Sequence, residues 1–461
     1  MSIRSADGVS FEALIPVLIV GAGAAGHVAA LACRDAGIDC AMLERDPQPQ
    51  GSTALSSGLV PAANTAMQRA KGIADTPALF AADIQRKAKG EADPLLVARL
   101  TETVGATVDW LARRHAIPFE LLEGFLYPGH SALRMHGTPR RTGAELMDSL
   151  VAAAAAAGAE TLTNAHVVEL YADNDGRVRG VGLLRPDGTQ ERLGCETLVL
   201  ACNGFGGNSE MVEQFLPEMR DALYFGHTGN RGDAVAWGQA LGAATRHLGA
   251  YQGHGSVADP HGILISWAVM MEGGIQVNRN GNRFSNEHHG YSEQSVAVLQ
   301  QPERVAFCIY DGRCHAAALQ FEEYRQAIAL GAVREFPDAQ ALAVAFGLPH
   351  DNLAHAIAQT QNASPDPFGR DFSGKQPLSP PFWGVRVTGA LFHTQGGLVV
   401  DADARVCRAD GTTLPNLFAA GGAACGVSGP AVWGYLSGNG LLSAVGLGRI
   451  AGEAAARSVS A

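Results

Sequence analysis

The fold is decided near the N-terminus by the stretch Ile15-Pro-Val-Leu-Ile-Val-Gly-Ala-Gly-Ala-Ala-Gly26. Its first six residues are apolar and rich in β-branched side chains, which is typical of a buried parallel strand. The glycines that follow have the spacing Gly-x-Gly-x-x-Gly, and His27–Gly37 has the composition of a helix that ends at a glycine. The sequence therefore predicts a strand, a tight turn and a helix in succession.

A second strand, predicted at Asp39–Leu43, ends at Glu44, which lies 18 residues after Gly26. In a dinucleotide site the glycines permit the turn and the close approach of the pyrophosphate, and the helix N-terminus attracts the phosphates. An acid after the second strand then binds the ribose hydroxyls. Because strand, glycines, helix and Glu44 occur in this order, we interpret the motif as a dinucleotide-binding site.

The composition limits the possible classes of protein. The chain has 461 residues, of which 47% are hydrophobic and 17% charged, so it can bury a large interior in two or three units. Its net charge of −11 argues against a nucleic acid or an anionic membrane as partner. A disordered, fibrous or membrane-embedded protein is excluded.

The cysteines suggest neither a metal site nor a disulfide framework. Eight are scattered along the chain, without a Cys-x-x-Cys pair or a Cys/His cluster, so no metal is predicted. Scattered thiols fit a reducing compartment. The apolar stretch Leu14–Ala25 contains the glycine turn and no cleavage context, so we do not interpret it as a signal peptide. The prediction is a cytoplasmic protein without a membrane span.

Two further segments favour FAD over NAD. Gly51-Ser-Thr-Ala-Leu-Ser-Ser-Gly58 supplies hydroxyls and backbone N–H groups where the phosphates and ring of a flavin would run. Leu417-Phe-Ala-Ala-Gly-Gly422 is another strand that enters a glycine turn. A late segment that completes the nucleotide site is unusual for a simple NAD domain.

Further motifs lie along the rest of the chain, at Ala201–Asn208, Thr228–Val235, Gly274–Glu287, His393–Leu398, Pro415–Gly421 and Gly438-Asn439. In this order the chain beyond about residue 14 resembles the FAD-dependent fumarate reductase/3-ketosteroid Δ1-dehydrogenase superfamily, with closer similarity to the ketosteroid branch. The resemblance implies an α/β fold, in which a Rossmann-like FAD-binding domain is split by an inserted α+β capping domain that carries substrate contacts.

The expected domain boundaries follow from this resemblance. Residues 15–247 and 376–461 would form the FAD-binding domain, and residues 248–375 the cap. The proline-rich segment Gln376–Pro381 marks the return crossing. Residues 1–14 are predicted to be a disordered extension. Helices are predicted at 95–114 and 143–157, and a hairpin over Thr163–Leu170 and Val178–Leu183.

The resemblance also assigns the residues that bind FAD. They are Gly21, Gly23, Ala25, Gly26, Glu44, Gly51, Ser52, Thr53, Ser57, Gly58, Val168, Asn203, Gly204, Asp233, Gly421, Gly422, Asn439, Leu441 and Leu442. Some members attach FAD covalently through a histidine, and Gly51–Gly58 contains none. Non-covalent FAD is therefore expected.

The substrate site departs from the fumarate reductase pattern. His254, His393 and Ser266 fill the expected substrate-binding places. The four places that hold the charged relay and the arginine clamp in reductases are taken here by Trp267, Met270, Tyr291 and Tyr435. An arginine clamp binds carboxylates through charged bidentate hydrogen bonds, which a phenol cannot reproduce. A neutral phenol suits a neutral carbonyl oxygen instead.

A pair of tyrosines at these places resembles the ketosteroid dehydrogenases. The resemblance makes Tyr291 the base that removes a proton beside the carbonyl. Tyr435 and the backbone N–H of Asn439 would hold the carbonyl oxygen, an effect worth roughly 3–4 kcal/mol per donor. Tyr127 resembles a third tyrosine that relays the proton. Because the usual phenol pKa is about 10, neighbours must lower the pKa of Tyr291 before it acts as a base.

The expected function is an FAD-dependent dehydrogenase that forms a C=C bond next to a ketone of a cyclic or steroid-like substrate, with the hydride passing to the flavin. Its partners would be the ketone and an external electron acceptor, namely a quinone, oxygen or an electron-transfer protein. The alternative is an ene-reductase of the fumarate reductase type, acting on an unsaturated acid or an enone. A non-catalytic flavin-binding protein is a third hypothesis, against which the intact tyrosine and His393 motifs argue.

Overall fold

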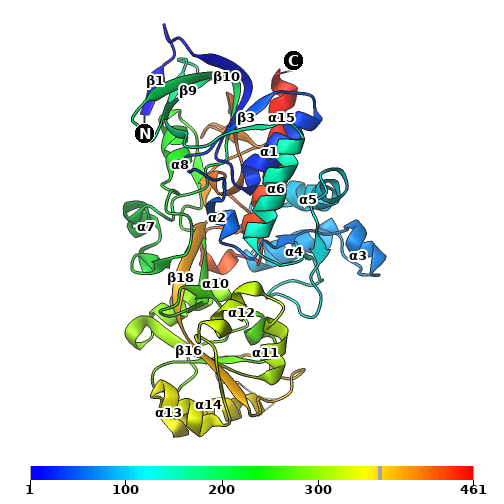
Figure 1. Ribbon diagram of the computed structural model, residues 1–461, viewed down its shortest axis with the longest axis vertical. Helices are drawn as coiled ribbons and strands as arrows, with labels where there is room; N and C mark the ends of the chain where they lie inside the picture. The colour runs from blue at the N-terminus through cyan, green and yellow to red at the C-terminus, as the bar shows by residue number, and fades with distance from the viewer. Residues whose placement is uncertain (1, 362–365, 460–461) are drawn as a thin grey trace.

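A computed structural model describes residues 2–361 and 366–459 of the chain. Three short parts of the predicted units lie outside the described residues. They are residue 1 of the predicted extension, residues 362–365 of the predicted cap and residues 460–461 of the predicted FAD-binding domain. Helices and strands both contribute to the fold, so the predicted α/β class is confirmed. Figure 1 shows two sheets toward opposite ends of the long axis, with the long strand β18 of the second sheet extending toward the first.

The first sheet contains the predicted N-terminal strand, β2, at its centre. β2 pairs in parallel with β3 on one side and with β10 on the other. Val17, Leu18 and Ile19 of β2 are fully buried, and helices α1(Ala24–Asp35) and α15(Asn439–Val459) pack against this strand. The strand order is β1(Ser2–Ser5), β8(His166–Ala172), β9(Val178–Leu184), β10(Gln190–Leu200), β2(Ala13–Val20), β3(Cys40–Leu43) and β7(Glu160–Leu162), and β10 also pairs with β21(Thr413–Ala419), which pairs with β20(Arg405–Cys407).

The prediction that residues 1–14 form a disordered extension was wrong for the described residues 2–14. Ser2–Ser5 form β1, which pairs in parallel with β8 from Ser2 opposite Glu169 to Ser5 opposite Ala172. Arg4 Nε also donates a hydrogen bond of 2.8 Å to Glu169 Oε1. This segment therefore obtains its backbone partners from a strand more than 160 residues away, which local composition does not reveal.

Two helices join the ends of the chain beside the glycine turn. α1(Ala24–Asp35) packs against α15(Asn439–Val459), as Figure 1 shows. Small residues bring the two helices together, since a Cβ on Gly448 would lie 2.7 Å from the carbonyl oxygen of Ala25. This close packing places the start of α15 next to the turn that begins α1.

The remaining helices of this half cover the first sheet or lie beside the seam with the second. The predicted helices at 95–114 and 143–157 are confirmed as α5(Pro94–Arg114) and α6(Gly143–Ala156), and the predicted hairpin is formed by β8 and β9. The others are α2(Gly51–Ala54), α3(Ala66–Ala70), α4(Pro77–Lys87), α7(Ser209–Phe215) and α8(Asp233–Ala240). A small sheet, β4(Val60–Pro61), β6(Met135–Gly137) and β5(Glu120–Leu121), lies among them.

The second sheet is built around β18(Phe382–Thr394), which pairs antiparallel with β13 and β16. β18 follows the predicted return at 376–381, so a strand assigned to the FAD-binding domain belongs by pairing to the sheet of the cap. We propose that the return crossing lies after β18. The other strands are β11(Leu223–Tyr224), β13(Tyr251–Ala258), β14(Ile263–Leu264), β15(Ile275–Val277), β16(Val305–Asp311) and β17(Arg334–Phe336), and β12(Thr245–Arg246) pairs separately with β19(Gly397–Leu398).

A buried ion network holds the helices of this second half. Arg370 NH1 donates to Glu287 Oε2 at 2.9 Å, and Arg370 NH2 donates to the carbonyl oxygen of Met270 at 2.7 Å. Arg283 also pairs with Glu287 and with Asp366. The helices of this half are α9(Ala268–Met271), α10(Tyr291–Leu299), α11(Gly312–Ala318), α12(Glu322–Ala329), α13(Ala339–Phe346) and α14(His350–Ala358).

Replacing Arg370 with methionine should lower the free energy of unfolding by about 3–5 kcal/mol, because Glu287 keeps one cation fewer in a buried place. The measurement is urea-induced unfolding. Arg304→Met is the matched control, since Arg304 pairs with Asp221 on the surface, where an ion pair contributes about 0–1 kcal/mol. Equal losses in the two variants would contradict the importance of the buried network.

Candidate active site and cofactor cavity

One cavity extends from the N-terminal glycine turn to the three predicted tyrosines. Most of the predicted cofactor residues line it, and all three tyrosines, His254, Ser266 and His393 line it as well. The cofactor residues on its wall are Gly21, Gly23, Ala25, Glu44, Gly51, Ser52, Thr53, Ser57, Gly58, Asn203, Asp233, Gly421, Gly422 and Leu441. The fold therefore brings together residues that are separated by more than 400 positions in the sequence.

The turn at the start of α1 has the geometry that a pyrophosphate needs. Gly21 has a φ of +102°, and a Cβ there would lie 2.6 Å from the carbonyl oxygen of Ala201. A Cβ on Gly26 would lie 2.0 Å from the carbonyl oxygen of Gly21. Only glycine fits at these two positions. α1 begins at Gly23 without a side-chain cap from that residue, and the N–H of Ala24 donates to Thr53 Oγ1 at 3.3 Å. Gly23, Ala24 and Ala25 lie on the cavity wall, where the N-terminal end of the helix attracts an anion.

Glu44 is held at the end of β3 with its carboxylate beside this turn. Its Oε2 accepts a hydrogen bond of 3.0 Å from the backbone N–H of Ala22, and its Oε1 accepts one of 3.1 Å from Asp46. Burial raises the pKa of Glu44, while these two N–H groups oppose the rise. Ser443 also lies on the cavity wall, and its buried hydroxyl has no hydrogen-bond partner in the described part of the chain. These features fit the ribose and pyrophosphate of FAD.

Five predicted cofactor residues do not line the cavity. Gly26 packs against the backbone of the turn, and Val167, the neighbour of Val168, lines the wall in its place. Gly204 packs against Thr394, and Leu442 is fully buried inside α15. The fifth residue is Asn439. In an α-helix or a strand, adjacent side chains point in different directions, so a motif that fixes the right segment can miss by one residue.

Asn439 does not offer the backbone donor that the sequence assigned to it. Its N–H donates to the carbonyl oxygen of Leu436 at 3.0 Å, inside the turn that begins α15. The neighbouring N–H of Gly440 instead reaches the hydroxyl oxygen of Tyr435 at 3.4 Å. The side chain of Asn439 donates to Ser428, which donates to Gln395. Gln395 Nε2 lies 3.1 Å from His393 Nδ1, so Asn439 supports His393 from behind.

Aromatic rings form the wall at the tyrosine end. The His254 ring stacks between Tyr291, at a centroid distance of 4.7 Å, and Phe392, at 5.4 Å. Trp267 meets His254 edge-on at 5.5 Å. His254 Nδ1 accepts a hydrogen bond from the backbone N–H of Ser256, so the neutral ring carries its proton on Nε2. Burial lowers the pKa of His254 to about 3 and that of His393 to about 4.

Charge is confined to the other end of the cavity. The charged residues on the wall, among the described residues, are Glu44, Arg45 and Asp233. Arg45 donates to the carbonyl oxygen of Gly229 at 2.5 Å and contacts His166 at 2.9 Å, beside Glu44. In the part of the chain that the structure describes, the tyrosine end therefore has neutral polar groups on aromatic walls and no guanidinium to bind a carboxylate.

The two principal tyrosines lie across the seam between the sheets. Tyr291 begins α10 and Tyr435 precedes α15, with ring centroids 6.1 Å apart. Burial raises the pKa of Tyr291 to about 12, although the hydroxyls of Ser437 and Tyr435 and the backbone of Gly438 hydrogen-bond to it and oppose the rise. Burial also raises the pKa of Tyr435. The condition for Tyr291 to act as a base, a pKa lowered by its neighbours, is not met here, and both phenols are protonated near neutral pH.

Tyr127 lies in the turn before His130, next to Phe125 at a centroid distance of 5.0 Å. Burial raises the pKa of Tyr127, and the nearby oxygen of Tyr291 adds to the rise. Sequence reasoning did not assign roles to Phe392, Gln395, Ser437 and Gly440, which all line the cavity. Each adjoins a motif residue, and that adjacency was the signal available in the sequence.

Comparisons with known proteins give the class. The FAD binding domain family matches residues 16–441, so the chain belongs to this family. The probable fumarate reductase Ifc3 of Shewanella frigidimarina (strain NCIMB 400) is 30% identical over 445 residues, covering 96% of this chain and 74% of the relative. The chain is thus an FAD-dependent oxidoreductase that acts on CH–CH groups, in the superfamily that the sequence motifs indicated.

Two solved structures resemble the fold. The open conformation of a flavocytochrome c3 fumarate reductase has a TM-score of 0.81 and 29% identity, covering 98% of this chain and 79% of that chain. The 3-ketosteroid-Δ4-(5α)-dehydrogenase of Rhodococcus jostii RHA1, in complex with 4-androstene-3,17-dione, has a TM-score of 0.76 and 25% identity, covering 98% and 99%. Among the described residues, no helix is both long and apolar enough to cross a membrane.

Replacing Gly26 with alanine should abolish stable FAD binding, because the added Cβ meets the carbonyl oxygen of Gly21 and displaces the phosphate turn. We expect the dissociation constant of FAD to rise by more than about 100-fold, which corresponds to about 2.7 kcal/mol. Flavin fluorescence during titration of the apoprotein measures it. Gly312→Ala is the control, since a Cβ there makes only ordinary contacts of 3.4 Å with Trp383. Tight FAD binding by Gly26→Ala would contradict this account of the turn.

The neutral His254 should make the protein less stable in acid. Its pKa of about 3 in the folded chain lies below the unfolded value of about 6.5, so the unfolded chain binds the additional proton between these limits. The free energy of unfolding should fall by up to about 1.4 kcal/mol per pH unit for this group as the pH drops below 6.5. Urea unfolding from pH 7 to pH 4 should show a shallower slope for His254→Gln, and an unchanged slope would contradict the assignment.

Proposed function

We propose that this chain reduces a C=C bond conjugated to an uncharged carbonyl group, converting an enone into the saturated ketone. The observation that carries the proposal is the absence of any charged side chain among the described residues at the tyrosine end of the cavity. A dianionic substrate would lose its hydration there without gaining a cation in return. An uncharged carbonyl carries no such cost, and aromatic walls suit its apolar skeleton.

The protonation state of Tyr291 supports the reducing direction. A phenol with a pKa of about 12 holds its proton at neutral pH, so it serves as a general acid more readily than as a base. In the proposed reaction Tyr291 transfers this proton to the α-carbon of the enone. FAD, once reduced by the external electron donor, would supply the hydride that the β-carbon receives, which is chemistry of the cofactor. The hydroxyl of Ser437 and the backbone of Gly438 stabilise the tyrosinate that remains.

The carbonyl oxygen would be held by Tyr435. The N–H of Gly440 already donates to the Tyr435 oxygen, which directs the phenolic proton away from Gly440 and toward another acceptor. A neutral His254 with its proton on Nε2 offers a further donor on the same wall. Donors of this kind stabilise charge that develops on the oxygen without placing a full charge in the pocket. Ser266 and His393 would complete the polar contacts.

Dehydrogenation of a cyclic or steroid-like ketone is the second candidate. The tyrosine pair and the likeness to the ketosteroid dehydrogenase of Rhodococcus jostii favour it. The same groups serve both directions, since a base in one direction is the acid in the other. Reduction of an unsaturated acid has support from the named fumarate reductase relatives, and the uncharged wall argues against it. An external electron donor or acceptor, non-covalent FAD and a cytoplasmic location belong to this proposal.

Reoxidation of the reduced enzyme distinguishes these substrates. Under anaerobic conditions cyclohex-2-enone should restore the oxidised flavin spectrum at least about tenfold faster than fumarate at equal concentration, because the pocket offers hydrogen bonds to a ketone and no cation to a dianion. Bleaching of the oxidised enzyme by cyclohexanone would establish the second candidate. Faster reoxidation by fumarate would contradict the proposal.

Tyr291→Phe should lower the rate of enone reduction by about 10²–10⁴-fold, because proton transfer to the α-carbon loses its donor. Stopped-flow absorbance of the flavin measures the rate. Tyr310→Phe is a matched control, since Tyr310 is a fully buried tyrosine whose hydroxyl bonds to Tyr324, and Tyr310 lies outside the cavity wall. Equal rates in wild type and Tyr291→Phe would show that the proton comes from another group.

A further inference from the structure

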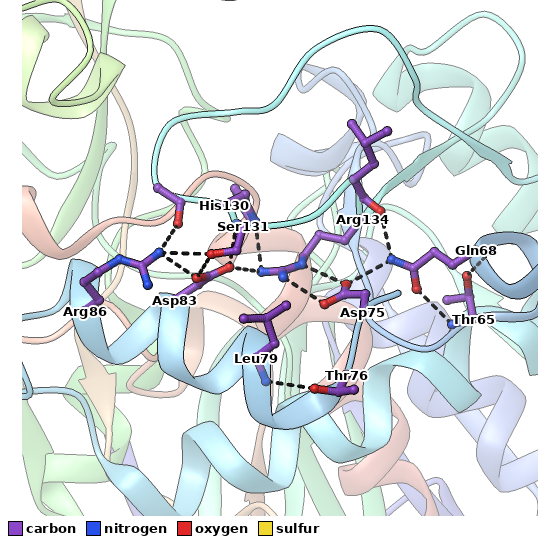
Figure 2. A network of polar contacts seen from close by, with 12 residues as sticks. Thr65, Gln68, Asp75, Thr76, Leu79, Asp83, Arg86, His130, Ser131 and Arg134 are labelled. Carbon is purple, nitrogen blue, oxygen red and sulfur yellow. Dashed lines mark hydrogen bonds and ion pairs between the residues drawn. The ribbon is translucent and has the colours of Figure 1, made fainter. Parts of the chain in front are cut away.

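A second buried ion network lies behind the tyrosine end of the cavity. Arg134 donates to Asp75 from Nε at 3.0 Å and from NH2 at 2.9 Å, and to Asp83 from NH1 at 2.6 Å. All three side chains are fully buried. Figure 2 shows the guanidinium of Arg134 between the two carboxylates, with His130 and Ser131 beside it. Asp83 belongs to α4 and also accepts hydrogen bonds from Ser131.

The network fixes the proton of His130. Arg134 NH1 lies 3.3 Å from His130 Nδ1, and because a guanidinium only donates, Nδ1 must be the acceptor. The ring proton is then on Nε2, which donates to the carbonyl oxygen of Ser437 at 3.0 Å. Burial, together with the charge of Arg134, lowers the pKa of His130 to about 3. The imidazole is therefore a neutral, oriented donor throughout the neutral pH range.

His130 connects the segments that carry all three tyrosines. Ser437 follows Tyr435 by two residues and lines the cavity with Tyr291, and its nearby hydroxyl opposes the rise that burial causes in the pKa of Tyr291. The backbone N–H of His130 donates to the carbonyl oxygen of Tyr127 at 3.2 Å, which closes the turn that holds Tyr127. His130 thus joins the turn before α15 through its imidazole and the turn around Tyr127 through its backbone N–H. Tyr291, at the start of α10, lies against Tyr435 of the first of these turns, with ring centroids 6.1 Å apart. It does not line the cavity.

Stability alone is a weak reason for such a network. The attraction within a buried ion pair is often no larger than the free energy needed to remove its charges from water, and apolar packing of the same volume is often as stable. What an ion pair adds is direction, because its hydrogen bonds fix both partners in one geometry. Here Asp75 and Asp83 fix the orientation of Arg134. Arg134 in turn orients His130, which donates to Ser437.

We propose that His130, oriented by Arg134, is a positioning residue that fixes the Tyr435–Gly438 turn, so that the hydroxyls of Tyr435 and Ser437 are held against Tyr291. This inference rests on the proposed function for its effect on turnover, and its structural part is independent of the substrate. It predicts that His130 acts through the tyrosine pair and not through the overall stability of the chain.

A double-mutant cycle in the FAD-loaded enzyme tests this coupling. His130→Leu removes the donor to Ser437 and should lower kcat for cyclohex-2-enone by about 10- to 100-fold, since small misplacement of catalytic groups is costly. In a Tyr435→Phe background the same change should lower kcat less than about twofold, because groups that act as a unit are not additive. His130→Gln keeps a side-chain N–H donor and should recover part of the rate.

His136→Leu is the matched control. His136 is a fully buried histidine in the same segment, and burial lowers its pKa to about 4. Its ring bonds to Thr65 and to the carbonyl oxygen of Arg134, and neither bond leads to Ser437. Its effect on kcat should be the same factor in both backgrounds. If His130→Leu also lowers kcat by one factor in both backgrounds, its role is only structural and the inference is wrong.

A readout without turnover separates this inference from the proposed function. Tyrosine labelled with ¹³C at Cζ reports the hydrogen bonding of each phenol by NMR, and Tyr→Phe variants assign the signals. In His130→Leu the Cζ signals of Tyr435 and Tyr291 should shift, and in His130→Gln, which keeps a donor at a changed position, they should shift by a smaller amount, while those of Tyr310 and Tyr324 stay unchanged in both. Unchanged Tyr435 and Tyr291 signals would overturn the inference, whether or not the wild type reduces enones. Shifted signals without enone turnover would leave the positioning role and reject the function.

Discussion

The hydroxyls of Tyr291 and Tyr435 lie where the two packed halves of the chain meet, and this seam withdraws water from both. Desolvation disfavours a charged phenolate, so it keeps both protons in place and raises the pKa of each tyrosine. The same loss of water makes the neighbouring His254 and His393 neutral. A site in which every titratable group is neutral favours donors and acceptors of hydrogen bonds over charge pairing.

The glycine turn at the start of α1 and the Tyr435–Gly438 turn belong to one packed unit. α15 packs along α1 through close glycine contacts, and α1 begins at the phosphate turn. The N-terminal end of α15 follows directly on the turn that carries Tyr435. Because both helices are rigid and in contact, the position of Tyr435 is fixed relative to the glycine turn. Tyr291 comes from the other sheet, so the closeness of the two tyrosines depends on how the halves pack.

The chain shares its fold with a fumarate reductase and with a ketosteroid dehydrogenase. Identity is higher to the reductase relative, at 30%, than to the ketosteroid dehydrogenase structure, at 25%. The wall at the tyrosine end is aromatic and uncharged in the described residues. Fold and overall similarity therefore identify the flavin chemistry, and the local wall bears on the substrate. This difference is expected when function depends on a few side chains placed on a common scaffold.

Local sequence determined the parts whose conformation depends on neighbouring residues. The β-branched run before Gly21, the glycine turn and the end of the second strand predicted the local structure, and the structure has the strand, the turn and Glu44 beside that turn. Helices α5 and α6 were predicted for the same reason. The motifs also selected Tyr291, Tyr435 and His254, which line one cavity. Only the tertiary structure decided that Ser2–Ser5 pair with β8, that Asn439 supports His393, and that burial raises the pKa of Tyr291. Pairing partners, side-chain direction and water exclusion come from segments far apart in the chain, and no local pattern contains them.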